Sequence, residues 1–142
     1  AFSRYKNNDA YAAIAVKVAV DTRGAVSLIK MWAAVDHGEV INLDGIKNQT
    51  EGGMIQGASW TLYEQVKFDQ QSITSTDWAS YPILKFTEIP EVEVAVIDRP
   101  DEPVLGGGEA AGPPTGAAIA NAVFRATGKR IYDLPIKVDG GV

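Results

Sequence analysis

The sequence predicts an α+β fold in a single domain over residues 1–142: a β-hairpin and further strands in a mixed or antiparallel sheet, packed with two main helices at about 48–66 and 114–127. Two segments alternate in hydrophobicity at the period of a strand, and two others repeat apolar residues at helical spacing. Glycine and proline turns separate these segments. At 142 residues and 46% hydrophobic composition, the chain is long enough for one core and short for two.

A hairpin is the first predicted part of the sheet. Small and apolar residues alternate from Tyr11 to Val20, a second extended run spans Ala25 to Val35, and Asp21-Thr22-Arg23-Gly24 supplies the turn. His37 follows the second strand between two acids. A lone histidine at a strand end is more often a hydrogen-bonding surface or loop residue than a metal ligand or proton relay, so we assign it no role.

The first main helix is predicted from about Asn48 to Val66, after turn chemistry at Asn42 to Gly45. Apolar or small residues occupy well over half of its circumference, so we expect it to be buried. It carries three glycines between positions 52 and 57, and each costs about 1 kcal/mol relative to alanine. Two explanations for glycine at these positions remain open: tight packing against another backbone, or the close approach of a ligand. A buried Gln56 beside these glycines would need hydrogen-bond partners.

The segment from Phe68 to Thr87 is polar and aromatic with little periodicity, which predicts a long loop or lid. Its Trp78 and Tyr81 could line a substrate channel, although loop aromatics more often pack the loop down. A half-buried strand is predicted from Glu91 to Ile97 and a short extended piece from Lys129 to Val138, after which the chain end should fray.

A glycine loop, an acid and a helix follow one another near the end of the chain. Gly106–Gly108 can adopt φ > 0 and approach another group closely, so the carboxylate of Glu109 is placed beside whatever group the loop approaches. Pro113-Pro114 then starts a helix that Gly128 closes. The arrangement is either a tight turn with a solvated glutamate, or a loop against a bound group with Glu109 as general base, a role worth roughly 10²–10⁴-fold.

Several classes of site are excluded. The glycine loop lacks the Gly-Lys-Ser/Thr ending of a P-loop, and Gly-Pro-Pro follows where the helix of a dinucleotide fingerprint should already run. A net charge of −5 with scattered basic residues argues against nucleic acid. With no cysteine and one histidine, the chain has no thiolate, iron–sulfur or histidine metal site of its own. No membrane span and no secretory signal is recognisable, which favours the cytoplasm over secretion.

Two blocks of the sequence resemble the large, molybdopterin-binding subunit of the xanthine dehydrogenase and aldehyde oxidoreductase family, the molybdenum hydroxylases. The run from Gly106 to Ile136, which opens Gly-Gly-Gly-Glu-Ala-Ala-Gly-Pro-Pro, resembles the C-terminal end of that subunit. The run from Asn48 to Glu64 resembles its pattern Asn-Gln-x-Glu-Gly-Gly-x-x-Gln-Gly-x-x-x-x-Leu-x-Glu.

The resemblance implies roles for four residues. In that family the glutamate after the glycines is the catalytic base beside molybdenum, which makes Glu109 the catalytic residue here. The glutamine aligned with Gln56 lies near the pterin, so Gln56, Gly107 and Gly108 are the expected cofactor-binding residues. No role carries over to Gln49. No metal ligand is expected, because the sulfurs of the pterin hold the molybdenum in those enzymes.

The implied activity is oxidative hydroxylation of an electron-poor carbon, in an aldehyde or beside a ring nitrogen. The partners implied are the remainder of the large subunit and an iron–sulfur small subunit that takes the electrons. The chain would then be a C-terminal fragment that is inactive alone, since the family's other cofactor-holding segments are absent. The substrate, electron acceptor and oligomeric state are not readable from the sequence.

Two rival functions remain open. The glycine loop and the first helix could belong to a non-catalytic binding or assembly module that packs against a partner subunit. A stand-alone enzyme could instead pair Glu109 with Asp133, but the sequence offers no evident nucleophile or second acid at a meaningful spacing.

Overall fold

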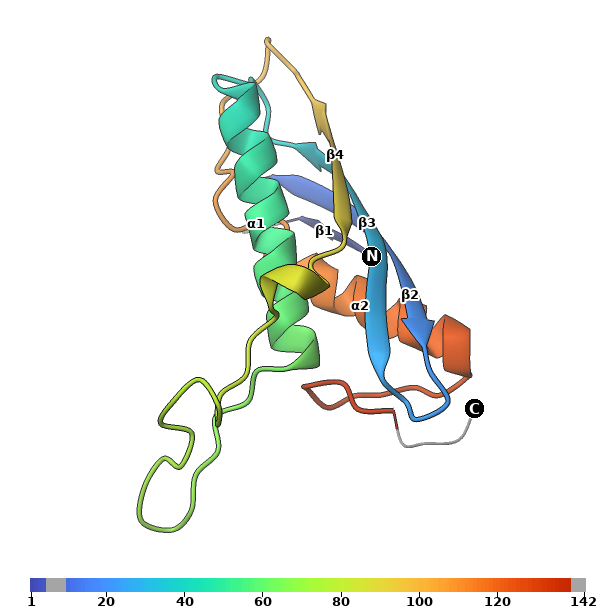
Figure 1. Cartoon of the computed structure of the whole chain (residues 1–142). Helices are drawn as coiled ribbons and strands as arrows, with labels where there is room; N and C mark the ends of the chain where they lie inside the picture. The colour runs from blue at the N-terminus through green and yellow to red at the C-terminus, as the bar shows by residue number, and fades with distance from the viewer. Residues whose placement is uncertain (5–9, 139–142) are drawn as a thin grey trace.

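The computed structural model describes residues 1–4 and 10–138 and confirms the α+β class (Figure 1). In chain order the elements are β1 (Phe2–Arg4), β2 (Tyr11–Val20), β3 (Val26–Asp36), α1 (Leu43–Leu62), a 3₁₀ turn (Phe86–Glu88), β4 (Glu91–Ile97) and α2 (Gly112–Thr127).

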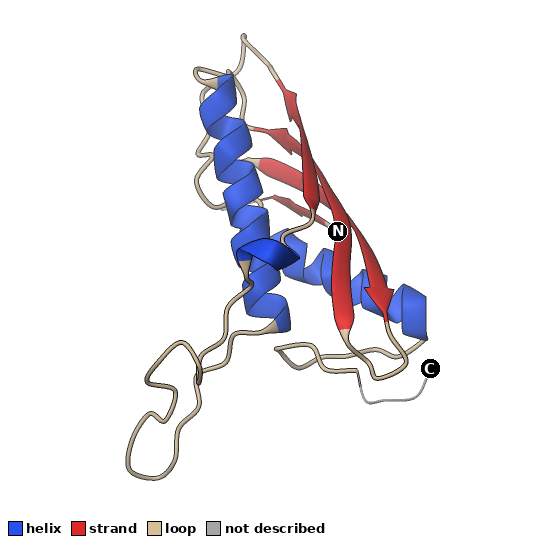
Figure 2. Ribbon diagram, in the orientation of Figure 1, coloured by secondary structure: helices blue, strands red, loops and turns tan. Residues whose placement is uncertain are grey.

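The four strands form one mixed sheet in the order β1-β2-β3-β4 (Figure 2). β1, β2 and β3 pair antiparallel, whereas β4 lies parallel to β3. The predicted hairpin is confirmed, and its turn is held by Asp21, whose Oδ1 accepts hydrogen bonds from the backbone N–H groups of Arg23 and Ala25 at 2.8 and 2.9 Å. Gly24 adopts φ 85°, which favours glycine at this corner.

Both helices cover the same face of the sheet. The inward-facing side chains of the middle strands are buried, including Ile14 on β2 and Met31 and Val35 on β3. The strand pairing skips Ile29, which is therefore the extra residue of a β-bulge. The extra residue shifts the alternation of β3 by one position. The inward-facing side chains are therefore Val26 and Leu28 before the bulge and Met31, Ala33 and Val35 after it. Over the described residues, no helix covers the opposite face of the sheet (Figure 2).

The predicted limits of the first helix are wrong by about one turn at each end. α1 begins at Leu43 because the Asn42 side chain caps it, accepting a hydrogen bond from the Gly45 N–H at 2.9 Å. The turn chemistry at 42–45 is thus the cap and first turn of the helix itself. α1 ends at Leu62 rather than Val66.

The expectation that this helix is buried holds for one of its faces only. Met54 and Ala58 lie fully in the core, but the face that carries Gln49, Gln56 and Trp60 is exposed, with Trp60 at 46%. This face borders the pocket described below.

The second helix is confirmed and starts two residues before the predicted position, at Gly112. Its prolines occupy the first turn, where a missing N–H costs no hydrogen bond. Gly128 ends it in the left-handed conformation, φ 72°. α2 packs on β2 and on α1, with Ile119 and Val123 in the core.

The long segment after α1 is a loop, as predicted, and it projects away from the body of the molecule (Figure 1). Tyr81 Oη donates a hydrogen bond to Glu64 at 2.8 Å near its base, while Trp78 is 77% exposed. The predicted extended piece at 129–138 forms no strand in the described part of the chain. The Ile136 N–H binds the Thr61 carbonyl oxygen at 2.7 Å, and the end expected to fray, 139–142, lies outside the described residues.

Candidate functional site

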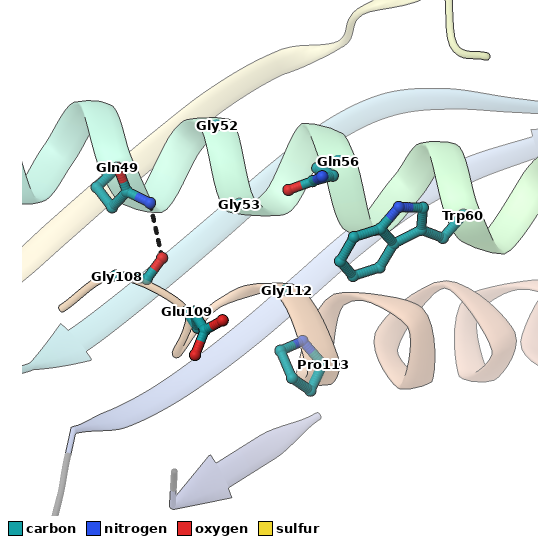
Figure 3. A pocket seen from close by; sticks show the side chains of 9 residues that line it. All are labelled: Gln49, Gly52, Gly53, Gln56, Trp60, Gly108, Glu109, Gly112 and Pro113. Carbon is teal, nitrogen blue, oxygen red and sulfur yellow. Dashed lines mark hydrogen bonds between the residues drawn. The ribbon is translucent and has the colours of Figure 1, made fainter. Parts of the chain in front are cut away.

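A pocket of about 540 Å³ lies between α1 and the glycine loop that leads into α2 (Figure 3). It is lined by Gln49, Gly52, Gly53, Gln56, Trp60, Gly108, Glu109, Gly112 and Pro113. The structure thus brings together three of the four predicted site residues, Gln56, Gly108 and Glu109. The fourth, Gly107, lines a neighbouring pocket of about 270 Å³ that shares Gln49 with the first.

One face of α1 forms a wall of this pocket. Gln49, Gly53, Gln56 and Trp60 follow one another at intervals of three or four residues, which places them on the same side of a helix. On the opposite side of the pocket, Figure 3 shows Glu109 below Gly108 at the entry to α2.

The glycines of α1 divide between the two explanations that the sequence left open. A Cβ at Gly57 would lie 2.7 Å from the Gly112 carbonyl oxygen and 3.2 Å from Thr115 Cβ, so this glycine allows α1 and α2 to approach closely. A Cβ at Gly52 would meet nothing within 4 Å, and Gly52 lines the pocket. Helix packing therefore accounts for Gly57, and Gly52 leaves one wall of the pocket bare.

Gln49 joins α1 to the glycine loop. Its Nε2 donates a hydrogen bond to the Gly108 carbonyl oxygen at 2.7 Å, one residue before Glu109 (Figure 3). Sequence reasoning assigned Gln49 no role. The available signal was its spacing of seven residues from Gln56, which places both amides on one helix face.

The glycine loop does not use the positive φ that its three glycines allow. The glycines with positive φ among the described residues are Gly24, Gly38 and Gly128, and none belongs to 106–108. A Cβ at Gly106 or Gly108 would meet nothing within 4 Å. The loop thus presents bare backbone without using the conformations that glycine alone favours.

His37 lies buried beneath this loop rather than on the surface, which corrects the sequence-based expectation. It is 1% exposed, and a Cβ at Gly107 would lie 3.6 Å from its ring atoms Cε1 and Nδ1. Among the described residues, no group meets hydrogen-bond geometry with either ring nitrogen. Burial lowers the pKa of His37 below its usual value, while the Gly106 backbone and the Asp36 carboxylate act in the opposite direction.

The chemistry available in the pocket is narrow. Of the nine lining residues, Glu109 is the only ionisable one, and it is exposed on the pocket side of the loop. Its carboxylate can exchange a proton, the two glutamine amides can donate or accept hydrogen bonds, and the glycine backbone can lie against a flat group. Asp133, Trp78 and Tyr81 do not line this pocket.

Metal and membrane sites have no support in the part of the chain that the structure covers. Over residues 1–4 and 10–138, no three histidine, aspartate or glutamate side chains gather as metal ligands would. No helix there has the length and apolar character needed to span a bilayer.

Comparison with known proteins identifies the family. Residues 3–90 match the model of the molybdopterin cofactor-binding domain. The chain is 43% identical over 131 residues to a subunit of the nicotinate dehydrogenase of Pseudomonas putida, an overlap of 92% of this chain and 11% of that protein. It is 32% identical over 138 residues to the beta chain of the isoquinoline 1-oxidoreductase of Brevundimonas diminuta, or 96% of this chain and 17% of that protein.

Solved structures give the same result. The fold matches the aldehyde oxidoreductase of Desulfovibrio gigas with a TM-score of 0.77 and 30% identity, over 89% of this chain and 14% of that one. It matches quinoline 2-oxidoreductase from Pseudomonas putida 86 with a TM-score of 0.80 and 25% identity, over 89% of this chain and 17% of that one. The chain thus spans between 11% and 17% of the length of these relatives. Because the family model, the sequence relatives and the solved structures agree, the chain belongs to the molybdopterin cofactor-binding domain family of the molybdenum hydroxylase large subunits.

Proposed function

We propose that this chain supplies the catalytic base and part of the cofactor pocket of a molybdenum hydroxylase that acts on an aldehyde or an N-heterocyclic carbon. One observation carries this proposal: Glu109, the only ionisable residue of the 540 Å³ pocket, faces the same space as Gln56 and the bare glycine backbone of α1. The names of the relatives, which include a nicotinate dehydrogenase, an isoquinoline oxidoreductase and an aldehyde oxidoreductase, support both substrate classes.

The lining residues fit a pterin cofactor. A pterin is flat and carries amide-like donors and acceptors along its edges, which neutral amides and backbone groups can satisfy. Gln56 and the backbone of Gly107 and Gly108 would hold it, with Gly52 leaving room for its approach. When bound, the molybdenum cofactor would supply the oxidation and the oxygen transfer to carbon.

Glu109 would hold and move the proton of this reaction. Its carboxylate oxygen would accept the proton of the hydroxyl group that attacks the substrate, because deprotonation makes that oxygen a better nucleophile. The Gln49 bond to the Gly108 carbonyl fixes the residue just before it, so the carboxylate is delivered from an anchored backbone. We expect the remainder of the large subunit to close the pocket and an iron–sulfur subunit to receive the electrons.

The decisive experiment is Glu109→Gln in the complete enzyme. Loss of a general base should lower kcat by at least about 100-fold while the molybdenum content stays unchanged. The matched control is Asp133→Asn, a carboxylate outside the pocket, which should leave kcat within about twofold. Near-normal turnover by Glu109→Gln would refute the proposal and favour the assembly-module alternative, and an equal loss in Asp133→Asn would favour the two-carboxylate alternative.

A further inference from the structure

The end of β3 holds the segment that leads to Glu109. The Leu105 N–H donates to the His37 carbonyl oxygen at 2.8 Å, and the Arg99 N–H donates to the Gly38 carbonyl oxygen at 3.1 Å. The Arg99 side chain also pairs with the Asp36 carboxylate, at 3.0 Å from Nε to Oδ2. Both ends of the 99–105 segment are therefore fixed to residues 36–38, directly before the glycine loop begins.

The close fit continues at Gly38. It adopts φ 73°, and a Cβ there would overlap the Pro103 carbonyl oxygen, so only glycine allows the two backbones to pass. The side chain of the preceding residue, His37, lies under the loop, where a Cβ at Gly107 would come within 3.6 Å of its ring. The same ring lines the 270 Å³ pocket that shares Gln49 with the site of Glu109.

A buried imidazole without hydrogen bonds is unfavourable if its only role is to fill space. A polar group buried without a hydrogen bond loses its hydration without compensation, and an apolar side chain of similar size would avoid this cost. The Gly106 backbone is nevertheless close enough to raise the pKa of the ring. Only an acceptor favours the protonated ring, so the group concerned is the Gly106 carbonyl oxygen, which does not reach hydrogen-bond geometry with either ring nitrogen.

We propose that His37 is a positioning residue for Glu109. Its ring, buried beneath the glycine loop, makes a polar contact with the Gly106 backbone that lies outside hydrogen-bond geometry in this structure, and so fixes the position from which Glu109 reaches the pocket. This inference rests on the proposed role of Glu109 as base. His37 does not touch the pocket of Glu109, so it acts through the loop.

The ring can make this contact in its neutral form, which burial favours over the protonated form. Burial lowers the pKa of His37. Three charged groups face it or its neighbours: Asp36 next in the chain, Glu39 in the same small pocket, and Arg99, which is paired with Asp36. A neutral imidazole retains one N–H donor, which is what a carbonyl requires.

The test uses the complete enzyme with His37→Leu, which keeps the approximate size but has no donor, and His37→Gln, which keeps an N–H. Val35→Ala is the matched control, because it removes buried volume from β3 two residues before His37 and leaves the imidazole in place. Each variant is measured for kcat, KM, molybdenum content and amide hydrogen exchange of residues 104–110.

His37→Leu should lower kcat by about 10- to 100-fold with KM within about twofold, since small misplacements of a catalytic group have effects of this size. In His37→Leu the amides of residues 104–110 should also exchange faster. His37→Gln should restore most of the kcat and most of the amide protection. Val35→Ala should leave kcat and loop exchange unchanged. Wild-type kcat and exchange in His37→Leu would overturn the inference, as would a His37→Gln variant as impaired as His37→Leu. A slow Glu109→Gln beside a normal His37→Leu would overturn the role of His37 alone, whereas a normal Glu109→Gln would refute the proposed base itself.

Discussion

Two side chains on opposite sides of the glycine loop set its position. Gln49 binds the Gly108 carbonyl oxygen from α1, and the His37 ring lies under the loop after the end of β3, where a Cβ at Gly107 would come within 3.6 Å of it. The first contact is a side-chain amide to a carbonyl, which contributes about 0.5–1.5 kcal/mol. Glu109 thus follows a backbone that is held from both sides, although glycine has the least intrinsic rigidity of any residue.

His37 also gives the chain a defined pH dependence. Because burial lowers its pKa below the ordinary value of 6.5, the unfolded chain binds a proton at a higher pH than the folded chain does. The associated stability is therefore complete above about pH 6.5 and is lost as the pH falls below that value. The aspartates with lowered pKa values, Asp21, Asp69 and Asp77, act at lower pH, since their ordinary value is 3.8.

We therefore expect the free energy of unfolding of the 142-residue chain to decrease between pH 7.5 and 5.5, by at most about 1.4 kcal/mol per pH unit. Urea denaturation at both pH values measures it. His37 is the only histidine, so His37→Gln should remove most of this slope even if it changes the stability at pH 7.5. An unchanged slope in that variant would mean that the ring is protonated equally easily in both states.

The sequence was informative about which residues of the site meet and less so about how they are held. Glu109, Gly108 and Gln56 line one pocket, because a glycine loop before a helix and a small-residue helix face are both local patterns. The burial of His37 was not predictable in the same way. It depends on Gly107, which is far away in sequence and reaches His37 only after β4 has paired with β3.

At the scale of elements, α1 shows how one helix serves packing and a site together. Gly57 meets the start of α2, and Gly52, five residues earlier, opens onto the pocket. The same substitution should therefore have opposite effects at the two positions, because helix propensity favours alanine at both and steric overlap opposes it at one.

Gly57→Ala should destabilise the chain by about 1–2 kcal/mol, as the cost of overpacking exceeds a propensity gain of about 1 kcal/mol. Gly52→Ala should stabilise it by up to about 1 kcal/mol. Urea denaturation measures both, and each variant controls for the other. In the complete enzyme, Gly52→Ala should lower the molybdenum content, because the new methyl group occupies the bare wall. A stabilised Gly52→Ala variant with full molybdenum content would show that the cofactor does not approach that wall.

The accuracy of the predicted element boundaries also depends on whether local sequence signals or distant contacts determine them. The hairpin, β4 and α2 were predicted closely, since alternation, turn residues and Gly128 are local signals. The start of α1 was missed because Asn42 and Gly45 suit a free turn and a helix cap equally well. β1 was missed because three residues are too few to show alternation, and it exists only through its pairing with β2.

On the scale of the whole molecule, two surfaces are more apolar than a free-standing domain needs. The uncovered face of the sheet carries exposed alanines in register across three strands, Ala13, Ala34 and Ala95. The projecting loop and the turn after it expose Trp78 at 77% and Phe86 at 89%. The chain spans 11% to 17% of its relatives' length, and we propose that the rest of a large subunit covers these surfaces.

Cofactor binding should also require further polypeptide. The 540 Å³ pocket has walls from α1 and the glycine loop and remains open, and the charge it offers is one carboxylate, which repels the phosphate of a pterin cofactor. The 142-residue chain produced alone should therefore carry no stoichiometric molybdenum and show no hydroxylase activity. Metal analysis and an aldehyde or N-heterocycle oxidation assay measure this, with the chain produced together with the rest of the large subunit as the control. One molybdenum per isolated chain, with turnover, would show that these residues alone complete the site.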